Sequence, residues 1–295
     1  MRRADLSVAG MWAELRGRAG RIEVLRRPSG VNVAGARYRR FVSPSPGLPP
    51  VELLRTFILR CIQSPTNREN YKLPPGRRPE FLLLIGICLR VRRFAQAYNR
   101  LERGGFSVEG RVLIRSALEH AVTAQYAHLV IGGMERLAVS GTRDQYGLAK
   151  FLAEFSSDPT VPDLVEQFAA ARLDGKGLPR FSGKDSIIEE LDNEAFLRTT
   201  YKVLSLVAHP SHQTTFDILD IDDDDVSVKL EPTDHYAHQM FYSLAAACML
   251  VAWLIAHLID DEAEMATLRD LANQLHMPWR LDGGLPDERR RFPLD

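Results

Sequence analysis

The segment from Met240 to Ile259 is the most apolar stretch of the chain, and it narrowly limits how the protein can fold. Its only clearly polar side chains are Tyr242, Ser243 and His257. A helix of this length that is apolar on every side must be surrounded by other helices or by lipid. Neither flank carries the Lys/Arg cluster that orients membrane spans, and the Ala-rich centre suits close helix packing. We therefore expect the central helix of a bundle and no membrane contact.

Helical periodicity extends over most of residues 49–277. Helices are expected over 50–62, 79–103, 107–130, 134–156, 161–173, 186–191, 193–208 and 261–277, with Ser107 as an N-cap. Between 214 and 230 the pattern changes to the β-rich runs TFDILDI and VSVKL, joined by four aspartates, which predicts a hairpin. The predicted fold class is mostly α: one domain, built as a bundle of seven to nine helices with one small β-hairpin insertion.

The two ends of the chain differ from this domain in composition. Residues 1–48 mix Gly, Pro, Ser and Arg without periodicity, which predicts a basic, flexible N-terminal arm. Residues 278–295 are rich in Pro and Arg, which predicts a loose C-terminal tail. The first residues contain no apolar run of the length that a secretory signal needs. The three cysteines lie in apolar stretches, which favours buried thiols over disulfides or a zinc site. We expect a cytoplasmic protein.

Charge divides the chain into two halves although the net charge is zero. Residues 1–115 hold 22 Arg and 1 Lys against 8 acidic residues, a net charge of +15, and residues 116–295 carry the balancing −15. This division predicts one of two arrangements. The basic half binds an anionic partner such as RNA, or the two halves pair with each other, within one chain or in a homodimer.

A polar stripe lies on the otherwise apolar helix expected at 193–208. Tyr201, Ser205 and His209 follow one another at intervals of four residues, so on a helix they share one face. Pro210 ends the helix directly afterwards. Polar groups on so apolar a helix must either satisfy one another inside the protein or line a cleft.

A second stripe lies on the helix expected to follow Ser107. Arg111, Arg115 and Glu119 are spaced by four residues, and His120 follows at once. Arg115 and Glu119 can pair along the helix, and we expect their face to meet the face of Tyr201. Such a contact would form either a catalytic cleft or a buried hydrogen-bond network that sets the register of two helices.

Two segments carry a resemblance to known families. RSALEH at 115–120 and YKVLSLVAHPS at 201–211 resemble an uncharacterised bacterial helical family with an Arg-x-x-x-Glu helix and a Tyr-x-x-Leu-Ser-x-x-x-His-Pro-Ser segment. The resemblance would cover about residues 80–260. More distantly, both segments are similar to the HEPN superfamily, helical domains that include many RNases of toxin–antitoxin and phage-defence systems. In that superfamily His follows Arg after four to six residues, a spacing that Arg115 and His120 match.

The HEPN resemblance implies cleavage of RNA without a metal ion. Such a reaction needs a His that moves the proton of the 2′-hydroxyl and an Arg that neutralises the phosphate oxygens. Positions 115 and 120 diverge by about 140° on a helix of about 3.6 residues per turn, so we expect the cleft to pair Arg115 with His209, a combination that departs from the family pattern. The expected orienting residues are Glu119, Tyr201 and Ser205.

Histidine spacing supports a hypothesis from another class. His209 and His212 precede the expected hairpin, His235 and His238 follow it, and aspartates lie nearby. Two such His pairs could bind zinc or another divalent ion in a hydrolase. A Gly-rich phosphate loop and a Gly-x-Ser-x-Gly elbow are both absent from the sequence, which argues against nucleoside triphosphate hydrolysis and acyl transfer. No cofactor is expected.

Overall fold

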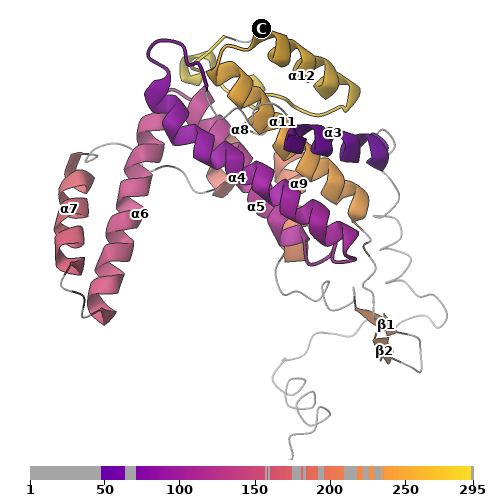
Figure 1. Ribbon diagram of the computed structural model, residues 1–295, viewed down its shortest axis with the longest axis horizontal. Coiled ribbons are helices and arrows are strands. Elements are labelled where there is room, and N and C mark those ends of the chain that lie inside the picture. The colour runs from indigo at the N-terminus through magenta and orange to yellow at the C-terminus, as the bar shows by residue number, and fades with distance from the viewer. Residues whose placement is uncertain are drawn as a thin grey trace, which may run out of the picture. The chain divides into compact units, whose positions relative to one another are not determined.

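The computed structural model describes residues 48–63, 71–156, 158, 160–174, 181, 184–191, 196–208, 218–221, 226–228, 234 and 236–293. Within these ranges the protein is mostly α-helical, as predicted, with nine α-helices and one two-stranded hairpin (Figure 1). The helices are α3 (Val51–Gln63), α4 (Arg78–Arg103), α5 (Arg111–Leu129), α6 (Gly133–Phe155), α7 (Val161–Asp174), α8 (Lys184–Leu191), α9 (Phe196–Ala208), α11 (Ala237–Leu258) and α12 (Glu262–Gln274). Except for its last residue, the predicted N-terminal arm lies outside the described residues.

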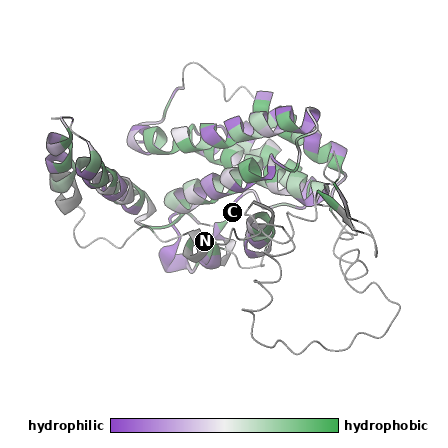
Figure 2. Cartoon of the chain, turned by 90° about the horizontal axis from the view of Figure 1, so that it is seen from below, coloured by the Kyte–Doolittle hydropathy of each residue, from purple (hydrophilic) through white to green (hydrophobic). Residues whose placement is uncertain are grey.

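Helix α11 is the central helix of the bundle, as the apolar segment predicted. It packs against α3, α4, α5, α9 and α12, and it lies with α4 and α5 in the middle of the packed helices in Figure 1. By length and composition alone it could also cross a membrane, but 83% of its most apolar stretch is buried inside the protein. The surrounding helices carry both green, apolar residues and purple, polar ones, as helices with one buried face do (Figure 2).

The turn between α4 and α5 positions the helix that carries Arg115. Gly105 has a φ of +82°, which suits glycine where α4 ends. The sequence predicted Ser107 as the N-cap of α5, but this prediction was wrong: the helix begins at Arg111, after Gly110, without a side-chain cap. Glycine is needed at 110 because a Cβ there would lie 2.8 Å from the ring of Tyr98 on α4. Close packing against α4 therefore explains the glycine directly before α5.

The hairpin lies within the predicted range. Strands β1 (Leu219–Ile221) and β2 (Val226–Val228) pair antiparallel, with Leu219 opposite Val228. Among the described residues they form the whole of one small sheet, so helices supply the core of the fold.

The C-terminal tail is packed, in contrast to the loose tail that the sequence predicted. It contains two short 3₁₀ turns, η2 (Asp282–Gly284) and η3 (Asp287–Arg289), and it buries Leu281 and Leu285. The backbone amide of Arg291 donates to the carbonyl of Leu129 at 2.8 Å. These contacts fix residues 278–293 against the end of α5. The reason is apolar burial together with backbone pairing, neither of which the Pro- and Arg-rich composition indicated.

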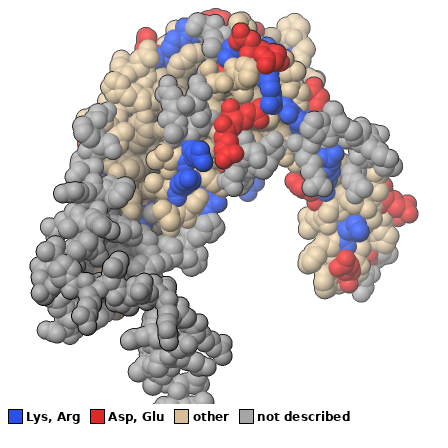
Figure 3. Space-filling model, turned by 180° about the vertical axis from the view of Figure 1, so that it is seen from behind, with Lys and Arg blue, Asp and Glu red and all other residues tan. Residues whose placement is uncertain are grey.

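At two described points an arginine of the basic half pairs with an acidic residue of the other half. Arg60 of α3 lies 3.2 Å from Glu264 of α12, and the buried Arg111 lies 2.8 Å from Asp234. On the face shown in Figure 3, basic and acidic side chains are interspersed. At these two points the halves pair within one chain, one of the two arrangements that the charge division predicted.

Candidate functional site

The two predicted polar stripes meet at one point. Arg115 and Glu119 lie on α5, and Tyr201 lies on α9, which packs against α5. Arg115 Nε donates to Glu119 Oε1 at 3.0 Å, and Arg115 Nη2 donates to Tyr201 Oη at 3.0 Å. Tyr201 Oη donates in turn to Glu119 Oε1 at 3.2 Å. The predicted contact between the stripes is confirmed at Tyr201, where three side chains form a closed ring of hydrogen bonds.

This network further stabilises the charged form of Arg115. Partial burial lowers the pKa of Arg115, but the hydrogen bonds with Tyr201 and Glu119 outweigh burial and raise that pKa. The guanidinium carbon also lies 5.2 Å from the centre of the Tyr201 ring, within the range of a cation–π contact. The side chain of Arg115 is 18% exposed and that of Glu119 is 11% exposed, so the network is not sealed inside the core.

The other predicted residues do not join this network through the hydrogen bonds described. Ser205 Oγ donates to the backbone carbonyl of Tyr201 at 2.7 Å, a bond within α9. His120 Nδ1 lies 2.7 Å from the carbonyl of Ser116, and its ring meets Phe94 edge-on. Arg115 and His120 therefore have separate partners, as their divergence on the helix predicted. His209 comes directly after α9 and lies outside the described residues.

The predicted metal ligands are mostly outside the described part of the chain. His212 and His235 lie there, as His209 does, whereas His238 Nε2 is 2.7 Å from the carbonyl of Pro49. Within the described ranges no group of three His, Cys, Asp or Glu side chains could hold a metal ion. The metal hypothesis stays a prediction.

A larger group of ionisable side chains lies at the opposite end of α5. It joins Glu80 at the start of α4, His128 near the end of α5 and His257 near the end of α11. His128 Nδ1 lies 2.7 Å from Glu80 Oε1, and His128 Nε2 lies 2.8 Å from His257 Nδ1. Glu80 and His128 are buried, and His257 is partly buried. We call these three residues the histidine relay.

The C-terminal tail completes the surroundings of the relay. Arg291 donates to both carboxylate oxygens of Glu80, and Arg77 Nη1 donates to Glu80 Oε2 at 3.3 Å. Phe292 stacks on the His128 ring, with ring centres 4.8 Å apart. A carboxylate from α4, two histidines from separate helices and an arginine from the tail thus meet at one place.

The pKa values of all three relay residues are shifted. Burial raises the pKa of Glu80, but hydrogen bonds from His128 and Arg291 outweigh it and lower that pKa to about 2. Burial lowers the pKa of His128 despite the opposing effect of Glu80. For His257, burial, followed by the nearby charges of His128 and Arg77, lowers the pKa to about 4. At neutral pH the carboxylate is therefore ionised and both imidazoles are neutral.

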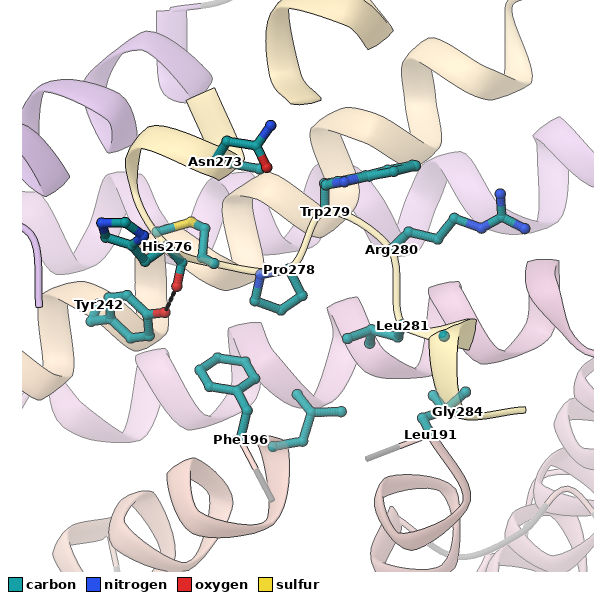
Figure 4. Close-up of a pocket in the computed structure, with 14 residues that line it drawn as sticks. Leu191, Phe196, Tyr242, Asn273, His276, Pro278, Trp279, Arg280, Leu281 and Gly284 are labelled. Carbon is teal, nitrogen blue, oxygen red and sulfur yellow. Dashed lines mark hydrogen bonds between the residues drawn. The ribbon is translucent and has the colours of Figure 1, made fainter. Parts of the chain in front are cut away.

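His257 borders a cavity of about 300 Å³ between the end of α11, helix α12 and the tail. Its walls include the rings of Trp253 and Phe292. A second cavity, of about 500 Å³, lies where the tail passes the ends of α8 and α9. In Figure 4 Leu191 and Phe196 face Pro278 and Leu281 across this second cavity, and Tyr242 donates to the carbonyl of His276. Of the site residues predicted from the sequence, those that the structure describes line neither cavity.

Sequence reasoning missed the relay because its members are far apart in the chain. Glu80 and Arg291 are separated by 211 positions, and His128 and His257 by 129. One signal was available: Glu80, His128 and His257 each lie in or beside an apolar helical run. Buried ionisable groups need partners, so three of them in the predicted core indicate a shared cluster.

Comparison with known proteins found no matching family model, no similar curated protein and no similar solved structure.

Proposed function

We propose that this protein acts on RNA or a nucleotide as a HEPN-like, metal-independent ribonuclease in a bacterial defence or toxin system. In this proposal Arg115 binds the phosphate, His209 moves the proton, and Glu119, Tyr201 and Ser205 orient them. The observation that carries it is the contact of Arg115 with Glu119 and Tyr201, because it joins the two segments on which the HEPN resemblance rests. His209 follows the end of α9 by one residue, eight positions after Tyr201.

The network suits phosphate chemistry for a physical reason. A cation that stabilises charge developing on phosphate oxygens works best when its orientation is set before the reaction. Glu119 and Tyr201 hold the Nε and Nη2 edges of Arg115, while the partial exposure of that side chain leaves it accessible to a polyanion. Arginine also matches the geometry of phosphate better than lysine does.

A second candidate function is that of a non-catalytic interaction protein. A different feature of the network supports it. Arg115, Glu119 and Tyr201 satisfy one another, as side chains do when they fix the register of two helices. Under this proposal the charge division between the halves serves a protein partner or a homodimer.

The decisive experiment incubates the purified full chain with total RNA and with short oligonucleotides, without added metal and with a chelator present. We expect cleavage by the wild type and its loss in Arg115→Ala and His209→Ala. Arg115→Lys keeps the charge but loses the two-edged geometry, so we expect a rate reduced by roughly 10²-fold or more. If the wild type leaves all RNA intact, the ribonuclease proposal is wrong.

The chain offers a control for each substitution. Arg55 also pairs with a glutamate, Glu102 at 2.8 Å, and also covers an aromatic ring, that of Phe241 at 4.8 Å. Arg55→Ala should therefore reproduce the structural cost of losing such an arginine while cleavage persists. His238→Ala removes a histidine outside the proposed site and should also leave cleavage intact. Cleavage that survives in Arg115→Ala and His209→Ala would refute the site, and unfolding of the Arg115 variant alone would favour the interaction protein.

A further inference from the structure

We propose that the histidine relay of Glu80, His128 and His257 serves a second binding site, the cavity of about 300 Å³ beside α12, and that this site takes a small planar aromatic ligand with an O–H group. His257 Nε2 would accept the hydrogen bond from that group. The site is separate from the Arg115 network, so it does not depend on the ribonuclease proposal.

The order of hydrogen bonds along the relay determines which atom is presented to a ligand. An ionised carboxylate can only accept, so Glu80 Oε1 accepts the Nδ1–H of His128. A neutral His128 then has a lone pair at Nε2, which must accept from the Nδ1–H of His257. It follows that the remaining nitrogen of His257, Nε2, is an acceptor.

Burial and cations keep the relay in this state. Arg77 and Arg291 hold the Glu80 carboxylate, which prevents it from taking the proton of His128. Arg280 lies at the cavity wall, where Asp282 binds it through both oxygens at 2.6 and 2.7 Å. A cation brought beside His257 would meet these guanidinium groups, so the site disfavours an ammonium ligand.

The walls of the cavity favour an aromatic ring. Trp253 stacks parallel to His257, with ring centres 5.1 Å apart and an angle of 15° between the planes. Phe292 meets His257 edge-on at 5.0 Å. Met265 adds an apolar surface from α12, and the exposed residues Glu262 and Arg269 also line the cavity. A flat ring can pack against these side chains while its hydroxyl reaches His257.

The nearby cations also select among hydrogen-bond donors. Arg280 and Arg269 both line the cavity and stabilise partial negative charge on an oxygen. The O–H of a phenol is more acidic than that of an aliphatic alcohol and is therefore the stronger hydrogen-bond donor, and the nearby cations stabilise the negative charge that develops on its oxygen as it donates. The ligand class is therefore phenolic, bound with its hydroxyl toward His257 and its ring against the lining side chains of Phe292 and Met265.

Phenol and anisole form a pair of probes because the methyl ether keeps the ring and the oxygen but replaces the donor hydrogen with a methyl group. The first measurement is the nitrogen NMR spectrum of the full chain with ¹⁵N-labelled histidine at pH 7. We expect both His128 and His257 to carry the proton on Nδ1. Protonation of His257 on Nε2, or a charged His257 ring, would overturn the proposal.

The second measurement adds the two probes. Phenol should shift the Nε2 resonance of His257 in a saturable manner, and anisole should bind at least tenfold more weakly. His257→Phe keeps a ring at this position without the acceptor and should lose the preference for phenol, whereas His276→Phe, in the other cavity, should keep it. Equal binding of both probes by the wild type, or no binding of phenol, refutes the proposal even if the His257 variant fails to fold.

Discussion

Acidification from pH 7.5 to pH 5 should destabilise the protein through His257. The pKa of this group is 6.5 in an unfolded chain and about 4 in the folded protein. Since the folded pKa is depressed, the unfolded state binds the proton first, and stability is lost as the pH falls from 6.5 toward 4. At 1.36 kcal/mol for each pKa unit, the titration of His257 alone lowers the free energy of unfolding by about 2 kcal/mol at pH 5. Solvent that reaches the ring through the cavity reduces this to about 1 kcal/mol.

The other groups around His257 can be separated from it by the choice of pH. His128 acts in the same direction because its pKa is also lowered. Glu80 contributes stability that is lost only as the pH falls from 4.5 toward 2, below the chosen range. Among the described residues, Arg77 and Arg280 also act on His257, Glu262 and Arg269 line its cavity, and Arg291 lies against Glu80.

Urea denaturation at pH 7.5 and pH 5 measures the effect in the wild type and in His257→Asn. Asparagine places an amide N–H near the former Nδ1–H and does not titrate. Acidification should therefore lower the free energy of unfolding of this variant by about 1 kcal/mol less than that of the wild type. His276→Asn, at an exposed position, is the control and should follow the wild type. Equal losses of unfolding free energy between pH 7.5 and pH 5 in the wild type and in His257→Asn would refute the assignment of a neutral, partly buried His257.

Three further substitutions test separate parts of the structure. Tyr201→Phe removes a hydroxyl that both accepts and donates a hydrogen bond, so urea denaturation should show a free energy of unfolding lowered by about 1–2 kcal/mol. An unchanged midpoint would show that the network adds no stability. Asp282→Ala removes the carboxylate partner of the largely buried Arg280 side chain, so we expect a loss of about 3–5 kcal/mol and faster proteolysis of the tail, whereas a protease-resistant tail would contradict its anchoring role. Gly110→Ala places a methyl group against the ring of Tyr98, so thermal denaturation should show a free energy of unfolding lowered by about 1–3 kcal/mol. An unchanged stability would mean that the two helices move apart easily.

The predicted network and the relay differ in how far sequence reasoning could reach. Arg115 and Glu119 are four residues apart, so one helix places them together, and Tyr201 stood out as a polar residue on an apolar helix. A single packing event, α5 against α9, then produced the predicted contact. The relay needed the correct arrangement of α4, α5, α11 and the tail at once, and none of these contacts leaves a local pattern.

The sequence alone determined the helices, the hairpin and the burial of α11, because periodicity, glycine turns and hydrophobicity act over a few residues. Only the tertiary structure decided that the tail packs and that Glu80, His128 and His257 share one interior chain of hydrogen bonds. The physical reason is distance along the chain. A buried carboxylate requires a partner, but any arginine of the Arg-rich sequence can satisfy that requirement, and packing selected Arg291, which lies 211 positions away.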